Sequence, residues 1–262
     1  MEHKKLGRVE DYNKVLPIVE VYTAVQSEGS RAGYPTVVIR TTGCTHRCYF
    51  GEGGWCDSFY TSIHPEKGKY TFQSIIDMYK ANPHIKEMML TGGSPTMIPH
   101  LVNELTHFAH ENDIFITIET EGSHFLATDY PINLLSISPK FSNSIPVLGV
   151  TTPQGAITDQ KMIDRHNKFR LNYEAISNSI SYHSDYHLKP VWDGKDEGSL
   201  KEILNCIKIL DIPQDKVWFM PAGDSREGLF KSYPLVFDWV RDNGYRMTWR
   251  PHIIAFEDQR EV

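Results

Sequence analysis

The chain has 262 residues, of which 40% are hydrophobic and 23% are charged, and it carries a formal net charge of -6. This length and composition suffice for one full hydrophobic core, so we expect a single domain over residues 1–262. No apolar run approaches the length of a membrane span, and the acidic balance excludes the basic footprint of extended nucleic-acid binding. We therefore expect neither a membrane nor a nucleic acid as a partner.

Hydrophobic periodicity predicts strands and helices that alternate along the chain. The predicted strands span, in chain order, residues 36–41, 87–91, 114–119, 134–138, 186–191, 217–220 and 245–249. The predicted helices span residues 70–81, 101–109, 162–176, 200–210 and 229–243. Such an alternation is typical of an α/β fold with a parallel sheet.

The stretch from 141 to 160 interrupts this alternation because it is rich in Ser, Pro, Gly and Thr and shows no clear period. We interpret it, together with the helical pattern that follows, as an insertion at about 141–183 within the single domain. Cys206 lies alone in an apolar helical pattern and is predicted to be a core residue.

Three cysteines follow the first predicted strand, at Cys44, Cys48 and Cys56. A structural zinc site is normally closed by four protein ligands, whereas three thiolates on one loop leave a metal centre one ligand short. Buried thiols fit this polar, Gly-rich loop poorly. A disulfide is disfavoured because no apolar signal segment opens the chain, so we expect a reducing, cytoplasmic location. A zinc site completed by His46 or His64 stays open as an alternative.

Thiolate sulfur suits iron-sulfur clusters. A 4Fe-4S cluster held by three cysteines would expose one iron, and that iron could bind S-adenosylmethionine. Polar or Gly-rich segments also follow the next three predicted strands, at 91–95, 119–122 and 138–140. Because the carboxyl ends of parallel strands meet at one rim, we expect these segments to join the cysteine loop in one site.

Several segments together resemble a known family. The cysteine loop and the run Thr91-Gly92-Gly93-Ser94-Pro95 are similar to those of the radical S-adenosylmethionine superfamily. The segments that resemble the 7-carboxy-7-deazaguanine synthases (QueE type) within it are Gln26-Ser27-Glu28-Gly29, Arg40, Cys56-Asp57-Ser58 and Ser138-Pro139-Lys140. The resemblance covers about 22–140 and resumes weakly at 187–223 and 250–252. It implies a partial, open TIM-like barrel of parallel strands.

The resemblance also implies an activity. In this family a 4Fe-4S cluster and S-adenosylmethionine generate a 5'-deoxyadenosyl radical, and S-adenosylmethionine acts as a cofactor. The radical takes a hydrogen from 6-carboxy-5,6,7,8-tetrahydropterin, whose ring contracts with loss of ammonia to 7-carboxy-7-deazaguanine. This carbon-nitrogen lyase reaction is a step toward queuosine-type deazaguanines, and Mg²⁺ assists it.

Roles for individual residues follow from the matched positions. The resemblance implies that Cys44, Cys48 and Cys56 bind the cluster and that Ser58 binds Mg²⁺. It implies S-adenosylmethionine contacts at Trp55, Asp57, Gly93, Ser94, Glu121, Ser138 and Lys140. It implies substrate contacts at Gln26, Ser27, Glu28, Arg40, Thr91 and His252. Gly92 and Gly93 would let the backbone approach the cofactor closely because they lack a side chain.

Two features depart from the family pattern. Seven residues separate Cys48 from Cys56, where the superfamily usually has two, and Gly51, Gly53 and Gly54 give this segment the freedom to turn. Ser94 stands where the family often has Glu to hold the methionine amino group, and a neighbouring carboxylate, Glu119 or Glu121, is a candidate to compensate.

The expected partners are a small pterin, an electron donor of the reductase or flavodoxin type, and a second copy of the chain in a homodimer, the last by family analogy alone. Two other functions stay open. An activase that installs a glycyl radical on a partner protein would share the three-cysteine loop, and a zinc-stabilised binding module would use the same thiols.

Overall fold

The computed structural model describes residues 5–62, 64–257 and 259–262. Within these residues, strands and helices alternate along most of the chain. The strands are β1 (Ile18–Val25), β2 (Pro35–Thr41), β3 (Glu87–Gly92), β4 (Phe115–Thr120), β5 (Leu134–Ile137), β6 (Tyr186–Leu188), β7 (Val191–Trp192), β8 (Trp218–Pro221) and β9 (Arg246–Met247). The α-helices are α1 (Phe72–Ala81), α2 (Pro99–Glu111), α3 (Gln160–Phe169), α4 (Tyr173–Tyr182), α5 (Glu197–Ile209), α6 (Arg226–Asn243) and α7 (Pro251–Phe256).

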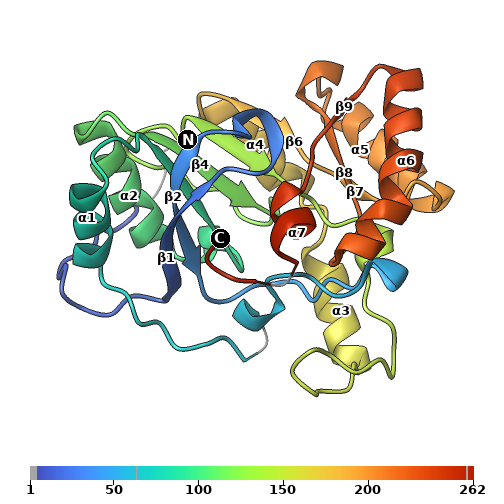
Figure 1. Cartoon of the computed structure of the whole chain (residues 1–262), viewed down its shortest axis with the longest axis horizontal. Helices are drawn as coiled ribbons and strands as arrows, with labels where there is room; N and C mark the ends of the chain where they lie inside the picture. The colour runs from blue at the N-terminus through green and yellow to red at the C-terminus, as the bar shows by residue number, and fades with distance from the viewer. Residues whose placement is uncertain (1–4, 63, 258) are drawn as a thin grey trace.

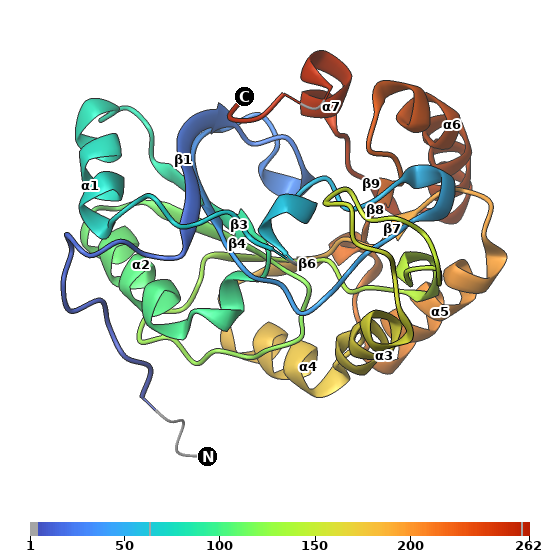
Figure 2. The same cartoon turned by 90° about the horizontal axis from the view of Figure 1, so that it is seen from below.

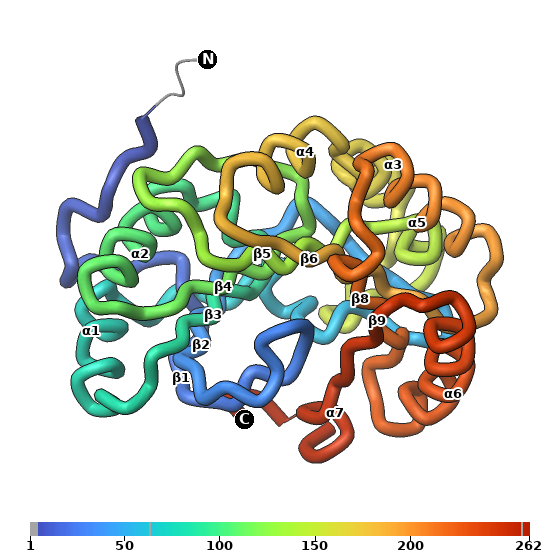
Figure 3. Tube along the Cα trace, turned by 90° about the horizontal axis from the view of Figure 1, so that it is seen from above, coloured from blue at the N-terminus to red at the C-terminus, as the bar shows by residue number. Residues whose placement is uncertain are grey.

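The strands form a curved wall that does not close. One sheet has the order β1-β2-β3-β4-β5-β6 and the second the order β7-β8-β9, and a bridge between Leu188 and Val217 links the two. Helices α1, α2, α4, α5 and α6 lie around the outer side of this wall (Figure 3). The expected open α/β barrel is thus confirmed.

The first strand adds one antiparallel edge strand to the expected parallel strands. β1 pairs antiparallel with β2, whereas all other paired strands are parallel in the described part. The sequence reading missed this strand, although its segment IVEVYTAV is rich in the β-branched and aromatic residues that favour strands. A hairpin needs only a short turn, so the antiparallel partner could precede the first parallel strand without a helix.

Three further differences have local causes. The strand predicted at 186–191 divides into β6 and β7 around Pro190, which has no N–H to donate to a ladder. The helix predicted at 162–176 divides into α3 and α4, because Leu171 takes a positive φ of 56° between them. The helix α7 was not predicted, and it begins at Pro251, a residue favoured in the first turn.

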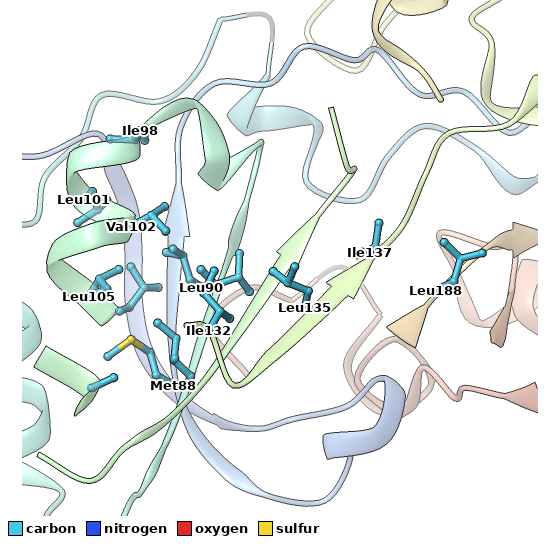
Figure 4. Packing of buried hydrophobic residues seen from close by; sticks show 14 of the residues in the cluster. Met88, Leu90, Ile98, Leu101, Val102, Leu105, Ile132, Leu135, Ile137 and Leu188 are labelled. Atoms are coloured by element: carbon cyan, nitrogen blue, oxygen red, sulfur yellow. The ribbon is translucent and has the colours of Figure 1, made fainter. Parts of the chain in front are cut away.

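The hydrophobic core lies between the sheet and its outer helices. Alternate residues of each central strand point outward, because successive side chains of a strand face opposite sides. In Figure 4, Leu101 and Leu105 of α2 lie against Met88 and Leu90 of β3, and all four are fully buried. The other face of the same strands therefore remains available for the interior of the barrel.

The C-terminal segment returns to the beginning of the barrel. The two views in Figures 1 and 2 place the C-terminus beside β1. Arg260 pairs through its Nε with Glu20 of β1, and its Nη1 lies 2.7 Å from Glu66 Oε1. In the described residues no helix is long and apolar enough to cross a membrane.

Candidate active site

A cavity of about 220 Å³ opens inside the barrel, at the carboxyl ends of the parallel strands and down the inner wall. Val38 and Arg40 of β2 and Met89 and Thr91 of β3 line it, and the residues between them pack outward into the core. The period of two along each strand therefore divides the wall into a core face and a cavity face.

Nearly all of the residues singled out in the sequence meet in this cavity. Those that line it are Gln26, Ser27, Glu28, Arg40, Cys44, Cys48, Trp55, Cys56, Asp57, Ser58, Thr91, Gly93, Glu121, Ser138, Lys140 and His252. Ser94 does not line it; this residue is fully buried directly behind Glu121. The expectation that the segments at the strand ends share one site with the cysteine loop agrees with this geometry.

The three cysteines are free thiols on the cavity wall. The backbone N–H of Cys56 donates to the carbonyl of Cys48 at 3.1 Å, and the N–H of His46 donates to Cys44 Sγ at 3.4 Å. Burial, and then the negative charge of Glu121, raise the pKa of Cys44 to about 12. Burial also raises the pKa of Cys48 and of Cys56.

These thiols fit a multinuclear cluster. Each thiolate charge opposes ionisation of another, so thiolates here need a nearby centre of positive charge, which an iron-sulfur cluster supplies. In the described residues no three His, Cys, Asp or Glu side chains are grouped to hold a single metal ion. His46 Nδ1 lies 2.9 Å from Thr45 Oγ1, whereas its buried Nε2 has no hydrogen-bond partner in the described residues; His64 is exposed.

The cysteine loop is fastened to α3 and to the segment before it by a buried histidine. The N–H of Arg47 donates to His166 Nδ1 on α3 at 3.1 Å, and Ser144 Oγ lies 3.1 Å from the other ring nitrogen. Burial lowers the pKa of His166 to about 3, so the ring is neutral and can accept from Arg47. The carbonyl of Ser144 also accepts from the N–H of Tyr49 at 3.0 Å.

A second group of charged residues extends from the cysteine loop along the interior. Lys189 Nζ is 2.5 Å from Glu28 and 2.7 Å from Glu119, and Arg250 bridges Glu28 and Asp57. Burial opposes ionisation of Glu28, but the charges of Lys189 and Arg250 outweigh it and lower the pKa of this carboxyl to about 2. The interior thus holds fixed charges of both signs next to three thiols.

Comparison of the sequence with known proteins shows to which family the chain belongs. No family model matches the chain. The chain is 32% identical over 251 residues to 7-carboxy-7-deazaguanine synthase of Halobacterium salinarum, which covers 94% of this chain and 93% of that protein. It is 30% identical to the 7-carboxy-7-deazaguanine synthase of Rhodopirellula baltica, over 94% of this chain and 88% of that one. The chain belongs to the 7-carboxy-7-deazaguanine synthase family.

The fold agrees with this family. The crystal structure of QueE from Escherichia coli superposes with a TM-score of 0.56 at 18% identity, and the match covers 88% of this chain and 92% of that one. The resemblance stated from the sequence motifs is confirmed, and with it the expectation of an enzyme. An activase and a zinc-stabilised module are not favoured for a member of the 7-carboxy-7-deazaguanine synthase family.

Sequence reasoning did not select two of the cavity's charged residues, Lys189 and Arg250. Lys189 follows directly after β6, and Arg250 lies three residues beyond the end of β9. In a 7-carboxy-7-deazaguanine synthase fold these strand ends meet the site, so a charged residue at that position was the available signal. Glu119, which sequence reasoning considered only as a substitute for Ser94, is held by Lys189 and by Thr91 Oγ1 at 2.8 Å.

The two glycines after β3 have a packing reason for lacking a side chain. A Cβ on Gly93 would lie 1.9 Å from the carbonyl oxygen of Gly43, and one on Gly92 would lie 2.4 Å from the N atom of Thr41. Thr41 is the last residue of the neighbouring strand β2, and Gly43 directly precedes Cys44 at the start of the cysteine loop. Close approach to a cofactor is therefore not needed to explain them.

The long interval between Cys48 and Cys56 forms a small compact excursion. Tyr49 and Trp55 bridge its base, with ring centroids 4.8 Å apart, and Gly54 takes a φ of 77° at its turn. Trp55 Nε1 also donates to the carbonyl of Thr151 at 3.2 Å. The additional residues thus leave Cys56 beside Cys48.

Proposed function

We propose that the chain converts 6-carboxy-5,6,7,8-tetrahydropterin to 7-carboxy-7-deazaguanine with S-adenosylmethionine and a 4Fe-4S cluster. Family membership supports the activity. The observation that carries it in this chain is the cavity in which three free thiols adjoin the charged interior. The product would feed 7-deazaguanine and queuosine synthesis.

Cys44, Cys48 and Cys56 would hold the cluster. When bound, the cluster and S-adenosylmethionine supply a 5'-deoxyadenosyl radical. Lys140, whose Nζ donates to Ser138 Oγ at 2.9 Å, lines the same wall and offers a cation to the cofactor. The cofactor contacts proposed here are Trp55, Asp57, Gly93, Ser94, Glu121, Ser138 and Lys140.

The pterin would occupy the charged interior. The substrate contacts proposed here are Gln26, Ser27, Glu28, Arg40, Thr91 and His252. Lys189 and Arg250 keep Glu28 ionised and fixed, so that its oxygens can accept from the amide and amino edge of the pterin. Arg40 is held by Glu20, which accepts from its Nε at 2.8 Å, and presents its fork to the cavity for the substrate carboxylate.

Magnesium, an electron donor and a second subunit complete the proposal. Ser58 Oγ lies on the cavity wall, 3.1 Å from the Asp57 carboxylate, and a hydroxyl oxygen is a hard ligand suited to Mg²⁺. A flavodoxin or a reductase would deliver the electron. The protein would act in the cytoplasm, and it would do so as a homodimer.

An anaerobic assay tests the activity. Protein reconstituted with iron and sulfide is incubated with dithionite, S-adenosylmethionine, Mg²⁺ and the carboxy-tetrahydropterin, and the products are identified by mass. We expect 7-carboxy-7-deazaguanine, and we expect no product when the pterin is replaced by a pterin without the carboxylate. Deoxyadenosine formation without conversion of the carboxy-pterin would point to another substrate and would contradict the proposal.

A further inference from the structure

Glu121 is a buried carboxylate with one unused oxygen. It follows β4, its side chain is 4% exposed, and it lines the cavity beside Cys44. Ser94 Oγ donates to its Oε1 at 2.6 Å, and Thr45 Oγ1 donates to the same oxygen at 3.4 Å. Its Oε2 is buried and has no hydrogen-bond partner in the described residues.

Within the described residues, the charge of this carboxylate is also left without a close cation. The ion-pair contact found for it in the described residues is His124, whose Nδ1 is 4.0 Å from Oε1, beyond hydrogen-bond distance. Lys140 on the same wall is bonded to Ser138. Glu119, two residues earlier, differs because Lys189 and Thr91 bind both of its oxygens. Leaving a buried carboxylate oxygen unpaired is costly, so its position favours a ligand that donates to it.

We propose that Glu121, oriented by Ser94, accepts a hydrogen bond from the amino group of S-adenosylmethionine; this rests on the proposed function. The carboxylate adjoins Cys44, where an amino acid bound beside the thiols would place its amine. The pterin is served by the paired carboxylates Glu28 and Glu119 farther along the interior. Two hydroxyls fix Oε1, so the carboxylate is oriented before the ligand arrives and little orientational freedom is lost on binding.

Binding to the reconstituted protein tests this contact without relying on turnover. S-adenosylmethionine is compared with 5'-methylthioadenosine, which keeps the adenosine and sulfur but lacks the amino acid. We expect Glu121→Gln to weaken S-adenosylmethionine binding roughly 10- to 100-fold, because one partner of a buried charged contact is lost. The same variant should change 5'-methylthioadenosine binding less than about 3-fold.

Two further variants separate recognition from structure. Glu52→Gln removes one charge from an exposed position on the cysteine-loop excursion and should bind both ligands like the wild type. The exchange Ser94→Glu with Glu121→Ser moves the carboxylate across the 2.6 Å contact and keeps the charge, and it should restore most of the lost affinity. Iron and sulfide content and the melting temperature are measured for each variant.

Each outcome decides the proposal. Unchanged S-adenosylmethionine binding in Glu121→Gln, or an equal loss for both ligands, overturns it. If Glu121→Gln does not fold or load its cluster, the exchange variant decides: wild-type affinity supports the proposal and weak binding by a folded, loaded protein overturns it. A wild type that loads its cluster yet fails to bind S-adenosylmethionine overturns the proposed function itself, and this contact with it.

Discussion

Burial places the cysteine thiols in a chemically demanding position. The raised pKa values of Cys44, Cys48 and Cys56 mean that the thiols are protonated at neutral pH in the absence of metal. Thiolates form here only when a positive centre offsets burial and their mutual repulsion. The cysteine loop is therefore held in shape by backbone hydrogen bonds and by His166, rather than by the thiols themselves.

Removal of one thiol should separate cluster binding from folding. We expect Cys56→Ala to lose its cluster. Its activity should then fall roughly 1000-fold or more. Its melting temperature without iron should stay within a few degrees of the wild type, because the Cys56 N–H still donates to Cys48. Absorbance, iron content and thermal melting measure these effects.

The fourth cysteine offers a matched control. Cys206 is fully buried in the core cluster on α5, so Cys206→Ala should cost about 1–2 kcal/mol of stability and keep a full complement of iron. Full cluster binding by Cys56→Ala would show that this residue is not a ligand.

At the level of the elements, the site depends on the close approach of β2 and β3 where both strands end. The N–H of Ser94 donates to the carbonyl of Gly43 at 2.7 Å, and the N–H of Gly93 donates to Thr41 at 3.1 Å. The cysteine loop thus starts from a backbone anchored to the neighbouring strand. α3 supports the same loop from the other side through His166.

A single methyl group at Gly93 should disturb this anchor. We expect Gly93→Ala to destabilise the fold by about 1–3 kcal/mol and to lower iron loading, because its Cβ would lie 1.9 Å from the carbonyl oxygen of Gly43. Chemical unfolding and iron analysis measure both effects. Gly7→Ala is the control, since its Cβ would make only an ordinary contact at 3.7 Å with His100. Wild-type stability of Gly93→Ala would contradict this prediction, because it would mean that the ends of β2 and β3 can move apart at little cost.

On the scale of the whole molecule, the interior charges join segments that lie far apart in the chain. Glu28 from the β1–β2 loop contacts Lys189 after β6 and Arg250 after β9, and Arg250 also contacts Asp57 beside the third cysteine. The N–H of Gly29 donates to Thr248 Oγ1 at 2.6 Å in the same region. These contacts span the open side of the barrel between β9 and β1.

This bridge should make stability depend on pH. The pKa of Glu28 is lowered from an ordinary value of 4.5 to about 2, so its stabilising effect is fully present above about pH 5 and is lost as the pH falls toward 2. We expect Glu28→Gln to be less stable than the wild type at pH 7, by a few kcal/mol, and the difference to shrink steadily below pH 4.5. Chemical unfolding at several pH values measures it. A constant difference between pH 7 and pH 3 would contradict the assignment.

Local patterns in the chain were sufficient to predict most elements and most of the site. Hydrophobic periodicity located the parallel strands β2 to β5, and the polar segments after them indicated where Cys44, Thr91, Glu121 and Lys140 would meet. Both predictions work because side-chain period and strand direction are properties of a few neighbouring residues. The family motifs then supplied the chemistry, which no periodicity contains.

Tertiary structure alone decided which charges are paired. Lys189 and Arg250 are distant from Glu28 in sequence, and only the curvature of the open barrel brings them within hydrogen-bond distance. The same arrangement of strands leaves both oxygens of Glu119 bound, whereas one oxygen of Glu121 has no partner in the described residues, although the two carboxylates stand two residues apart. Pairing and burial depend on distances between strands, and a linear pattern of residue types carries no information about those distances.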